Sequence, residues 1–267
     1  MKKILVPIGS TKKAVNTLQY VIDFVEGTEA VLYVINVYST TKVAGSLKNL
    51  EAVLEEDSTK EIEEILKKVD TKGVEIISKP IKGNINDAIE RVAVQLDVDL
   101  IITSAKAVSQ GDDVYVGSIT GGLIKNTNIP MLILPKKYKF KKIEKIMMAI
   151  KSGMLSSSDI LDPLKDILLK FGAVLDLVRV IVPESTAEDS VLDEGLKSLA
   201  ATYKTTENAT VFQGVLEHIH SIDPDVICVI RRKRGFLTRL FEQNRILKKN
   251  FESRVPLLVL KASEREL

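Results

Sequence analysis

The sequence predicts an α/β fold built from two consecutive domains, each a doubly wound parallel sheet of five strands. Three observations lead to it: the chain repeats itself, its strand segments are apolar on both faces, and helices separate them. Asp99–Lys106 matches Asp225–Arg232, and Ile129–Lys136 matches Val255–Ala262, both at an offset of 126 (from 99 to 225 and from 129 to 255). A repeat of this length indicates a duplicated domain.

The first copy alternates between strand and helix patterns. Its five predicted strands are short apolar runs at residues 3–8, 30–37, 74–81, 99–104 and 131–135. The first helix, capped by Ser10 or Thr11 and stopped by Gly27, carries an apolar stripe at Ala14, Leu18, Val21, Ile22 and Val25. Two further stripes predict helices at Leu47, Leu50, Leu54, Ile62, Ile65 and Val69, and at Ala88, Ile89, Val92, Ala93 and Leu96. A fourth helix precedes the last strand.

The second copy repeats the plan, with strands expected at residues 143–150, 173–182, 210–215, 225–230 and 256–261. We place the first domain at residues 1–137 and the second, more divergent one at 143–267, joined by the basic connector 136–142. Apolar strands separated by helices belong to parallel sheets covered on both sides. Ligands of such sheets bind at the carboxyl ends of the strands, where the winding direction reverses.

Composition and charge exclude several classes of protein. The 267 residues are 45% hydrophobic and 28% charged, as is usual for globular proteins. The 38 basic and 36 acidic residues nearly cancel, so neither nucleic acid nor a membrane is expected as a partner. No secretion signal or membrane-spanning run is evident, and the single cysteine, Cys228, predicts a buried thiol in a cytoplasmic protein. His218 and His220 have no further ligand at metal spacing, so no metal site is expected.

The motifs in both copies resemble the universal stress proteins in their tandem form. The similarity rests on KILVPIGS (3–10), GNINDAIERVAVQLDVDLII (83–102) and VGSITGGLIKNTNIPMLILP (116–135), and on residues 231–261 of the second copy. The resemblance implies a five-stranded parallel sheet that in many members holds ATP or another adenine nucleotide. It also implies pairing through the last strands, within the chain as a pseudo-two-fold pair of domains or between chains as a homodimer.

The family's nucleotide signature is Gly-x-x-Gly, nine residues, then Gly-Ser or Gly-Thr. Carried over, it places Ser104 and Ala107 at the two glycine positions and keeps Gly117-Ser118. Gly9 stands where the family has an aspartate, and Val34 at its adenine-side valine. The nucleotide-binding residues expected from the resemblance are Ile8, Gly9, Ser10, Val34, Ser104, Ala107, Gly117, Ser118 and Ile119.

Two interpretations of this partial signature stay open. Gly117 and the following helix N-terminus form an anion site for ATP, ADP or AMP, or Gly117-Ser118 is only a turn with a helix cap. The second copy has Ile230, Lys233, Gln243 and Asn244 at the signature positions, so no nucleotide is expected there. Its basic run 231–234 is either an anion site or a solvated loop, the latter being commoner for charge runs.

The function predicted from the sequence is a stress-response binding protein regulated by an adenine nucleotide in the first domain, with an unknown protein partner. The alternative is an interaction protein that works without nucleotide and carries a degenerate site. No catalytic residues are assigned, because no pair of carboxylates or nucleophile motif is present. Slow ATP hydrolysis or phosphoryl transfer to a local hydroxyl is a third option, although the absent aspartate removes a metal ligand.

Overall fold

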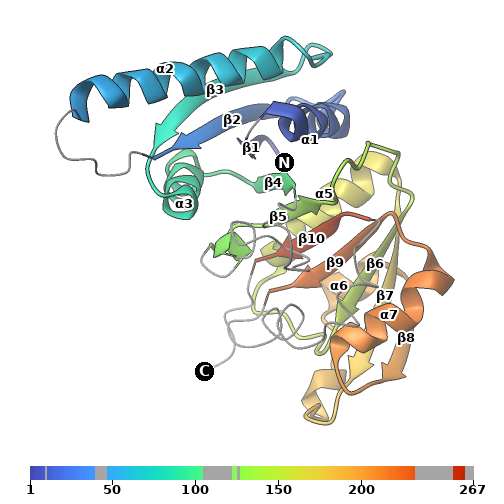
Figure 1. The fold of residues 1–267 in the computed structure, drawn as a ribbon. Coiled ribbons are helices and arrows are strands. Elements are labelled where there is room, and N and C mark those ends of the chain that lie inside the picture. The colour runs from blue at the N-terminus through green and yellow to red at the C-terminus, as the bar shows by residue number, and fades with distance from the viewer. Residues whose placement is uncertain (10, 40–46, 105–121, 125–126, 232–254, 262–267) are drawn as a thin grey trace. The chain divides into compact units, whose positions relative to one another are not determined.

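The computed structural model describes residues 1–9, 11–39, 47–104, 122–124, 127–231 and 255–261. They form two compact units that divide between Phe140 and Lys141 (Figure 1). The aromatic residues before this point belong to the first unit, because Tyr138 and Phe140 pack on Tyr20, with ring centroids 6.0 and 5.5 Å from it. Residues 136–140, five of the seven in the predicted connector, therefore belong to the first unit.

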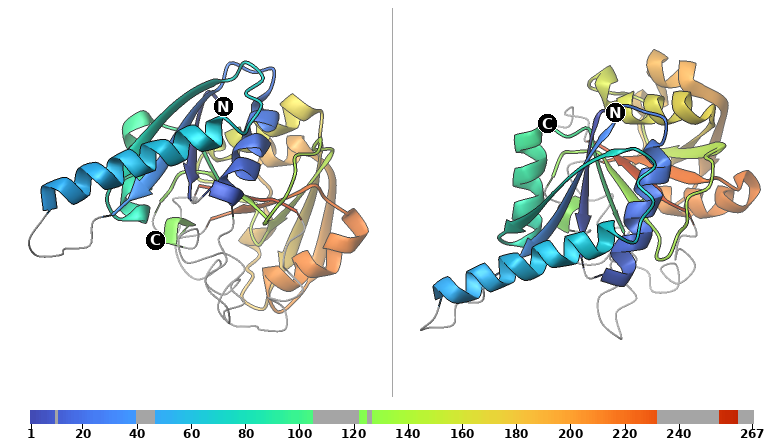
Figure 2. Two further views of the ribbon diagram at one scale, coloured as in Figure 1. Left: turned by 45° about the horizontal axis from the view of Figure 1, so that its top comes forward. Right: turned by 90° about the horizontal axis from the view of Figure 1, so that it is seen from above.

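The first unit contains five parallel strands in the order β3-β2-β1-β4-β5. Their bounds are β1 Lys3–Ile8, β2 Val31–Tyr38, β3 Glu75–Lys82, β4 Leu100–Ser104 and β5 Met131–Leu134. The helices are α1 Thr11–Val25, α2 Leu47–Leu66 and α3 Ile85–Leu96. Figures 1 and 2 show α1 and α2 on one face of the sheet and α3 on the other. This is the doubly wound arrangement that the sequence predicted.

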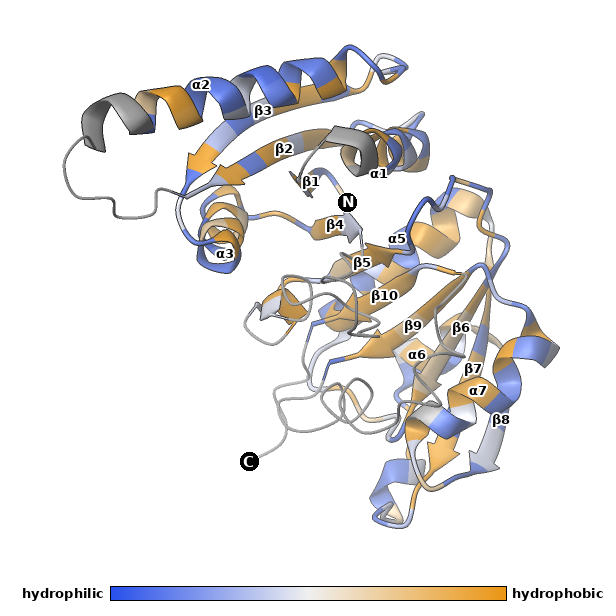
Figure 3. Cartoon of the chain, viewed as in Figure 1, coloured by the Kyte–Doolittle hydropathy of each residue, from blue (hydrophilic) through white to orange (hydrophobic). Residues whose placement is uncertain are grey.

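The apolar stripes predicted for α1 and α3 face the core of the first unit, and of the α2 stripe Ile62 and Ile65 are buried. Every predicted stripe residue of α1 is buried, and Gly27, with φ 77°, ends the helix in the left-handed region. In α3, Ala88, Ile89, Val92 and Ala93 are buried, while Asn84 caps the helix by accepting a hydrogen bond from the Asn86 N–H. Figure 3 shows the same division, with hydrophobic colour along the strands and hydrophilic colour over much of α2.

The second unit repeats the winding with the strand order β10-β9-β6-β7-β8. Its strands are β6 Lys145–Ile150, β7 Val174–Ile181, β8 Ala200–Glu207, β9 Val226–Ile230 and β10 Leu257–Leu260. Its helical elements are η1 Ser158–Leu161, α5 Asp162–Phe171, η2 Glu188–Ser190, α6 Glu194–Leu199 and α7 Val211–Ile222. The crossover between β7 and β8 carries only the short elements η2 and α6, where the first unit has the 20-residue helix α2.

The prediction of a strand at residues 210–215 is wrong. Thr210 caps α7 by accepting a hydrogen bond from the Gln213 N–H, and the third strand of this unit is β8, ten residues earlier in the chain. β8 has the sequence AATYKTTE and is largely exposed at the edge of its sheet, so it lacks the apolar run that marks the other strands. The apolar residues of the segment after β8 led to the strand prediction, but in the structure they pack the helix α7.

An aspartate ties the start of the first strand to the start of the fourth in both units. The Asp99 carboxylate accepts hydrogen bonds from the backbone N–H groups of Lys2 (2.6 Å) and Lys3 (2.9 Å). Asp225, at the equivalent place, accepts from Glu144 (2.7 Å) and Lys145 (3.0 Å). We call each arrangement an aspartate clasp. It confirms that these aspartates belong to the starts of strands and not to a site at the opposite edge.

Candidate functional site

The reversal of winding in the first unit lies between β1 and β4. β1 and β4 are parallel, with Ile4 beside Leu100 and Leu5 beside Ile101. Extending this register places Ile8 next to Ser104 at the carboxyl edge, where ligands of doubly wound sheets bind. Gly9, which follows β1, is exposed, and Ser104 is partly exposed. The structure therefore brings the predicted residues Ile8, Gly9 and Ser104 together at one edge.

The two strands at this reversal stop pairing before they reach that edge. β1 pairs with β2 over all six of its residues, yet with β4 only at Ile4 and Leu5. The physical cause is Pro7, which has no N–H to donate to β4. The N–H of Ile101 donates to Pro130 beside β5 (2.9 Å), so the neighbouring residues Leu100 and Ile102 face β1, and in this parallel ladder residue 7 would donate to the carbonyl of Ile102. β1 and β4 are thus paired only at Ile4 and Leu5, in their amino-terminal halves.

In the second unit the equivalent strands, β6 and β9, stay paired closer to the carboxyl edge. Its ladder starts in the same way, with the N–H of Asp225 donating to Lys145 (2.9 Å). β6 and β9 then pair at four positions, from Ile146 beside Val226 to Ala149 beside Val229. Ala149 occupies the place of Pro7 and has an N–H. This difference favours a ligand crevice in the first unit over one in the second.

The other predicted site residues do not join this group. Val34 lies beside Val6 within the sheet and has no exposed surface, so it packs beneath the carboxyl edge and does not line it. Ser10, Ala107, Gly117, Ser118 and Ile119 lie outside the described residues. In the second unit, Ile230 is a buried strand residue, and Lys233, Gln243 and Asn244 again lie outside the described residues.

Two polar residues near this edge were not singled out from the sequence. Asn36, beside Ile8 on β2, is 8% exposed and donates from Nδ2 to the Glu61 carboxylate of α2 (2.8 Å). Thr103, next to Ser104, is also buried. The available signal was a polar residue near the carboxyl end of an otherwise apolar strand, as in VLYVINVY and LIITS. Buried polar groups are hydrogen-bonded as a rule, so a polar residue in such a strand is expected to have a hydrogen-bond partner.

Gly122 has a packing role that needs no ligand. A Cβ atom added to it would lie 2.2 Å from Nδ2 of Asn86 in α3, so only glycine fits without displacing that side chain. Its neighbours Leu123 and Ile124 are buried. The second glycine of the sequence TGGL therefore fixes the approach of this segment to the start of α3.

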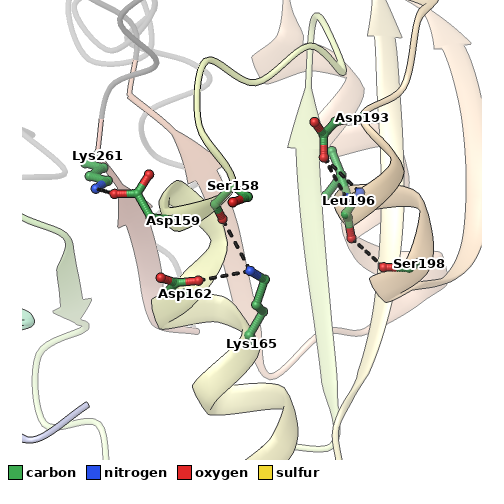
Figure 4. Close-up of polar contacts among 9 residues, drawn as sticks. Ser158, Asp159, Asp162, Lys165, Asp193, Leu196, Ser198 and Lys261 are labelled. Carbon is green, nitrogen blue, oxygen red and sulfur yellow. Dashed lines mark hydrogen bonds and ion pairs between the residues drawn. The ribbon is translucent and has the colours of Figure 1, made fainter.

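The equivalent edge of the second unit is charged. Lys151 follows β6, Arg231 follows β9 and Lys261 follows β10. Figure 4 shows Lys261 reaching the Asp159 carboxylate of η1, and this pair holds the pKa of Asp159 below its usual value. In the first unit the same positions are Gly9, Ala105 and Pro135.

The single cysteine has the buried position that its apolar neighbours predicted. Cys228 is fully buried in β9 with a free thiol, as predicted, and burial raises its pKa. No group of three or more His, Cys, Asp or Glu residues that could hold a metal occurs among the described residues. None of the helices in the described part of the chain has the length and apolar character to span a bilayer.

Comparisons with known proteins agree with this architecture. A sequence profile described as the Universal stress protein family matches residues 1–135, half of the chain. No curated protein sequence matches the chain significantly. A universal stress protein from Archaeoglobus fulgidus DSM 4304 has 17% identity and a TM-score of 0.73, with 99% of this chain and 97% of that one aligned.

Two solved structures from Pseudomonas aeruginosa also align over nearly the whole chain. A functionally unknown protein of strain PAO1 has 16% identity and a TM-score of 0.59, covering 98% of this chain and 93% of that one. A universal stress protein of strain UCBPP-PA14, described as putative in its name, has 16% identity and a TM-score of 0.57, covering 97% and 93%. These likenesses concern the fold, and the profile match concerns the family. The chain belongs to the universal stress protein family.

Proposed function

We propose that this protein is a stress-response binding protein whose state is set by an adenine nucleotide held at the carboxyl edge of the first sheet. The observation that carries the proposal is the unpaired end of β1 and β4, with Pro7 as its cause. Ligands of doubly wound sheets bind in the crevice outside the carboxyl ends of the strands at this reversal. Gly9 and Ser104, one on each side of it, present small residues to a ligand.

Phosphate binding is the part of nucleotide recognition that this edge supports best. Gly9 leaves room for close approach of phosphate oxygens to the backbone, and the Ser104 hydroxyl is a hydrogen-bond donor. The sequence adds Gly117-Ser118 before a helix, whose N–H groups favour an anion. Gly9 offers no carboxylate to a ribose or a metal, so we expect moderate affinity and no efficient hydrolysis.

The alternative is an interaction protein that has lost the site and keeps the scaffold. Its support is the replacement of two signature glycines by Ser104 and Ala107. The two functions differ in whether nucleotide changes the stability of the protein, because any ligand that binds the folded state raises its melting temperature.

The experiment is to purify the protein without added nucleotide, denature it and chromatograph the released small molecules. Thermal melts with ATP, ADP and AMP follow on the same preparation. We expect co-purified adenine nucleotide or a rise of about 5 °C at saturating ligand. Release of no nucleotide, together with unchanged melts, would favour the scaffold alternative.

Three variants locate the site. Ser104→Leu places a bulky side chain at the carboxyl edge beside Ile8, and Gly117→Val places one in the signature loop; both should abolish the nucleotide response. Ser78→Leu is the matched control, because Ser78 is an exposed serine on the edge strand β3. A nucleotide response that survives Ser104→Leu would place the site elsewhere in the chain.

A further inference from the structure

The second unit buries a cation for which the described residues offer no partner. Arg179 of β7 is 9% exposed, and its side chain has neither a hydrogen bond nor an ion pair within the described part of the chain; its Nε atom is fully buried. Burying an uncompensated charge is costly, so buried cations are almost always paired. Arg179 therefore calls for an anion that the described residues do not supply.

The position of Arg179 can be compared directly with the first unit. Arg179 lies beside Ile150, the last residue of β6, as Asn36 lies beside Ile8, the last residue of β1. Asn36 is satisfied by Glu61 from the long helix α2. In the second unit the corresponding crossover has only η2 and α6, and no carboxylate from either is paired with Arg179. The second unit therefore has the cation of Arg179 where the first has the amide of Asn36, and its described crossover has no counterpart of the Glu61 carboxylate.

Arg179 faces the side of the sheet away from α7. The neighbouring residue Val180 points toward α7, because a Cβ atom added to Gly214 of that helix would lie 2.5 Å from its Cγ2. Successive residues of a strand point to opposite faces, so Arg179 points toward the face of the β7–β8 crossover. It lies two residues before the end of β7, close to the carboxyl edge.

Three more cations lie at the same edge, because parallel strands end together. They are Lys151, Arg231 and Lys261, each the first residue after its strand. Carboxylates accompany two of them: Asp189 is 3.9 Å from the Lys151 Nζ atom, and Asp159 pairs with Lys261. Asp189 is itself engaged by the Thr186 N–H (2.9 Å). Arg179 is therefore the buried cation of this edge that has no carboxylate among the described residues.

We propose that the carboxyl edge of the second sheet binds a phosphate-class oxyanion, with the Arg179 guanidinium as its anchor. A guanidinium presents paired N–H donors that match two oxygens of one phosphate. This site lies in the unit where no nucleotide cradle of the family type was expected, and it uses side-chain charge in place of glycine backbone.

The probe is inorganic phosphate, titrated into the full-length protein at constant ionic strength maintained with NaCl. Glycerol 3-phosphate in a parallel titration distinguishes a free ion from a phosphate ester. We expect one of them to raise the melting temperature saturably, by about 5 °C, and to give a heat of binding in calorimetry. If neither exceeds the effect of chloride alone, the proposal is overturned.

Arg179→Met tests the anchor. We expect the affinity for phosphate to fall at least about tenfold, while the melting temperature without phosphate stays the same or rises, since an uncompensated buried charge is removed. An arginine with only a structural role would give the opposite pair of results, a lower melting temperature and an unchanged phosphate response. Arg179→Lys keeps the charge without the paired donors and should retain a weaker phosphate response. This second variant keeps the test valid if the methionine variant does not fold.

Two controls separate this site from general charge effects and from the first unit. Lys204→Met removes one exposed positive charge from β8, where Lys204 lies beside Val178 and therefore on the other face from Arg179. It should leave the phosphate response intact. Ser104→Leu, which targets the first sheet, should also leave it intact. Loss of the response in either variant would overturn the assignment to Arg179.

Discussion

Pro7 and Ala149 occupy the same place in the first strand of the two units and have opposite effects on pairing. Beyond Leu5, β1 makes no further pair with β4, whereas β6 pairs with β9 as far as Ala149. A single missing N–H explains the difference, because a parallel ladder needs a donor at that position. The proposed nucleotide crevice therefore depends on the backbone N–H that Pro7 lacks.

Pro7→Ala should close the crevice of the first unit. The new N–H can donate to the carbonyl of Ile102, so the amide of residue 7 should be protected in hydrogen exchange. We expect nucleotide affinity to fall while overall stability changes little, since one added hydrogen bond offsets the entropy that proline removed from the unfolded chain. Calorimetry with ATP measures the first effect.

The reciprocal variant is the control for this prediction. Ala149→Pro removes a ladder bond from the second unit and should lower its free energy of unfolding by about 3 kcal/mol. A protected amide at residue 7 combined with unchanged nucleotide affinity would show that the gap does not hold the ligand.

At the scale of elements, α7 lies on its sheet at a distance set by a glycine. A Cβ atom on Gly214 would lie 2.5, 2.9 and 3.2 Å from three atoms of Val180. Glycine within a helix normally costs about 1 kcal/mol relative to alanine. Here close packing against β7 reverses that preference.

Gly214→Ala should therefore destabilise the protein by about 1–3 kcal/mol, the usual effect of overpacking. The measurement is urea denaturation followed by circular dichroism. Val180→Ala should make room for the added methyl group, so the double variant should be more stable than the sum of the single effects predicts. Strict additivity would contradict the contact between α7 and β7.

The aspartate clasp of the second unit connects β6 and β9 electrostatically. Burial by itself raises the pKa of Asp225, but the Lys141 ammonium (2.6 Å) and the N–H groups of Glu144 and Lys145 outweigh it and lower the pKa below its usual value. A carboxyl with a lowered folded-state pKa stabilises the fold above its unfolded pKa of about 4. That contribution is lost as the pH falls through the folded-state pKa.

Asp225→Asn should reduce the free energy of unfolding by about 1–2 kcal/mol at pH 7, because hydrogen bonds to a charged acceptor become bonds to a neutral one. The difference from the unmodified protein should shrink on acidification and vanish below the folded-state pKa of Asp225. Urea titrations at a series of pH values measure it. A difference that stays constant from pH 7 to pH 2.5 would show that the charge of Asp225 is irrelevant.

At the scale of the whole molecule, the two units share a winding and differ in the chemistry of their carboxyl edges. The first presents Gly9, Asn36 and Pro135, where the second presents Lys151, Arg179 and Lys261. The two units thus differ in two ways at their carboxyl edges. The first presents uncharged residues and its central strands pair only at Ile4 and Leu5, whereas the second presents cations and its central strands pair at four positions. We propose that the units bind different ligands.

The sequence also predicts that the two units pair through their last strands, and this remains a prediction. Residues 1–140 and 141–267, produced as separate chains, should then associate when mixed. Size-exclusion chromatography with light scattering measures the complex, and β5 carrying Ile133→Lys should weaken it. Two halves that fold but elute independently would favour domains connected only by a linker.

The sequence by itself determined the duplication, the doubly wound class and nine of the ten strands, because these depend on apolar periodicity along the chain. It also identified Ile8, Gly9 and Ser104 as neighbours, since strand ends at a reversal of winding must meet. The failures have one cause. The exposed strand β8 has no apolar run, and the buried Arg179 has no local pattern, because both depend on which residues lie beside them in the sheet.

Only the tertiary structure shows where β1 and β4 stop pairing, and that Arg179 has no partner among the described residues. Pro7 acts on Ile102, almost a hundred residues away in the sequence, and the crossover beside Arg179 has no counterpart of the 20-residue helix α2 that supplies Glu61 to Asn36. Hydrogen bonds and charge compensation are properties of pairs, so they become visible only when both members of a pair have been placed.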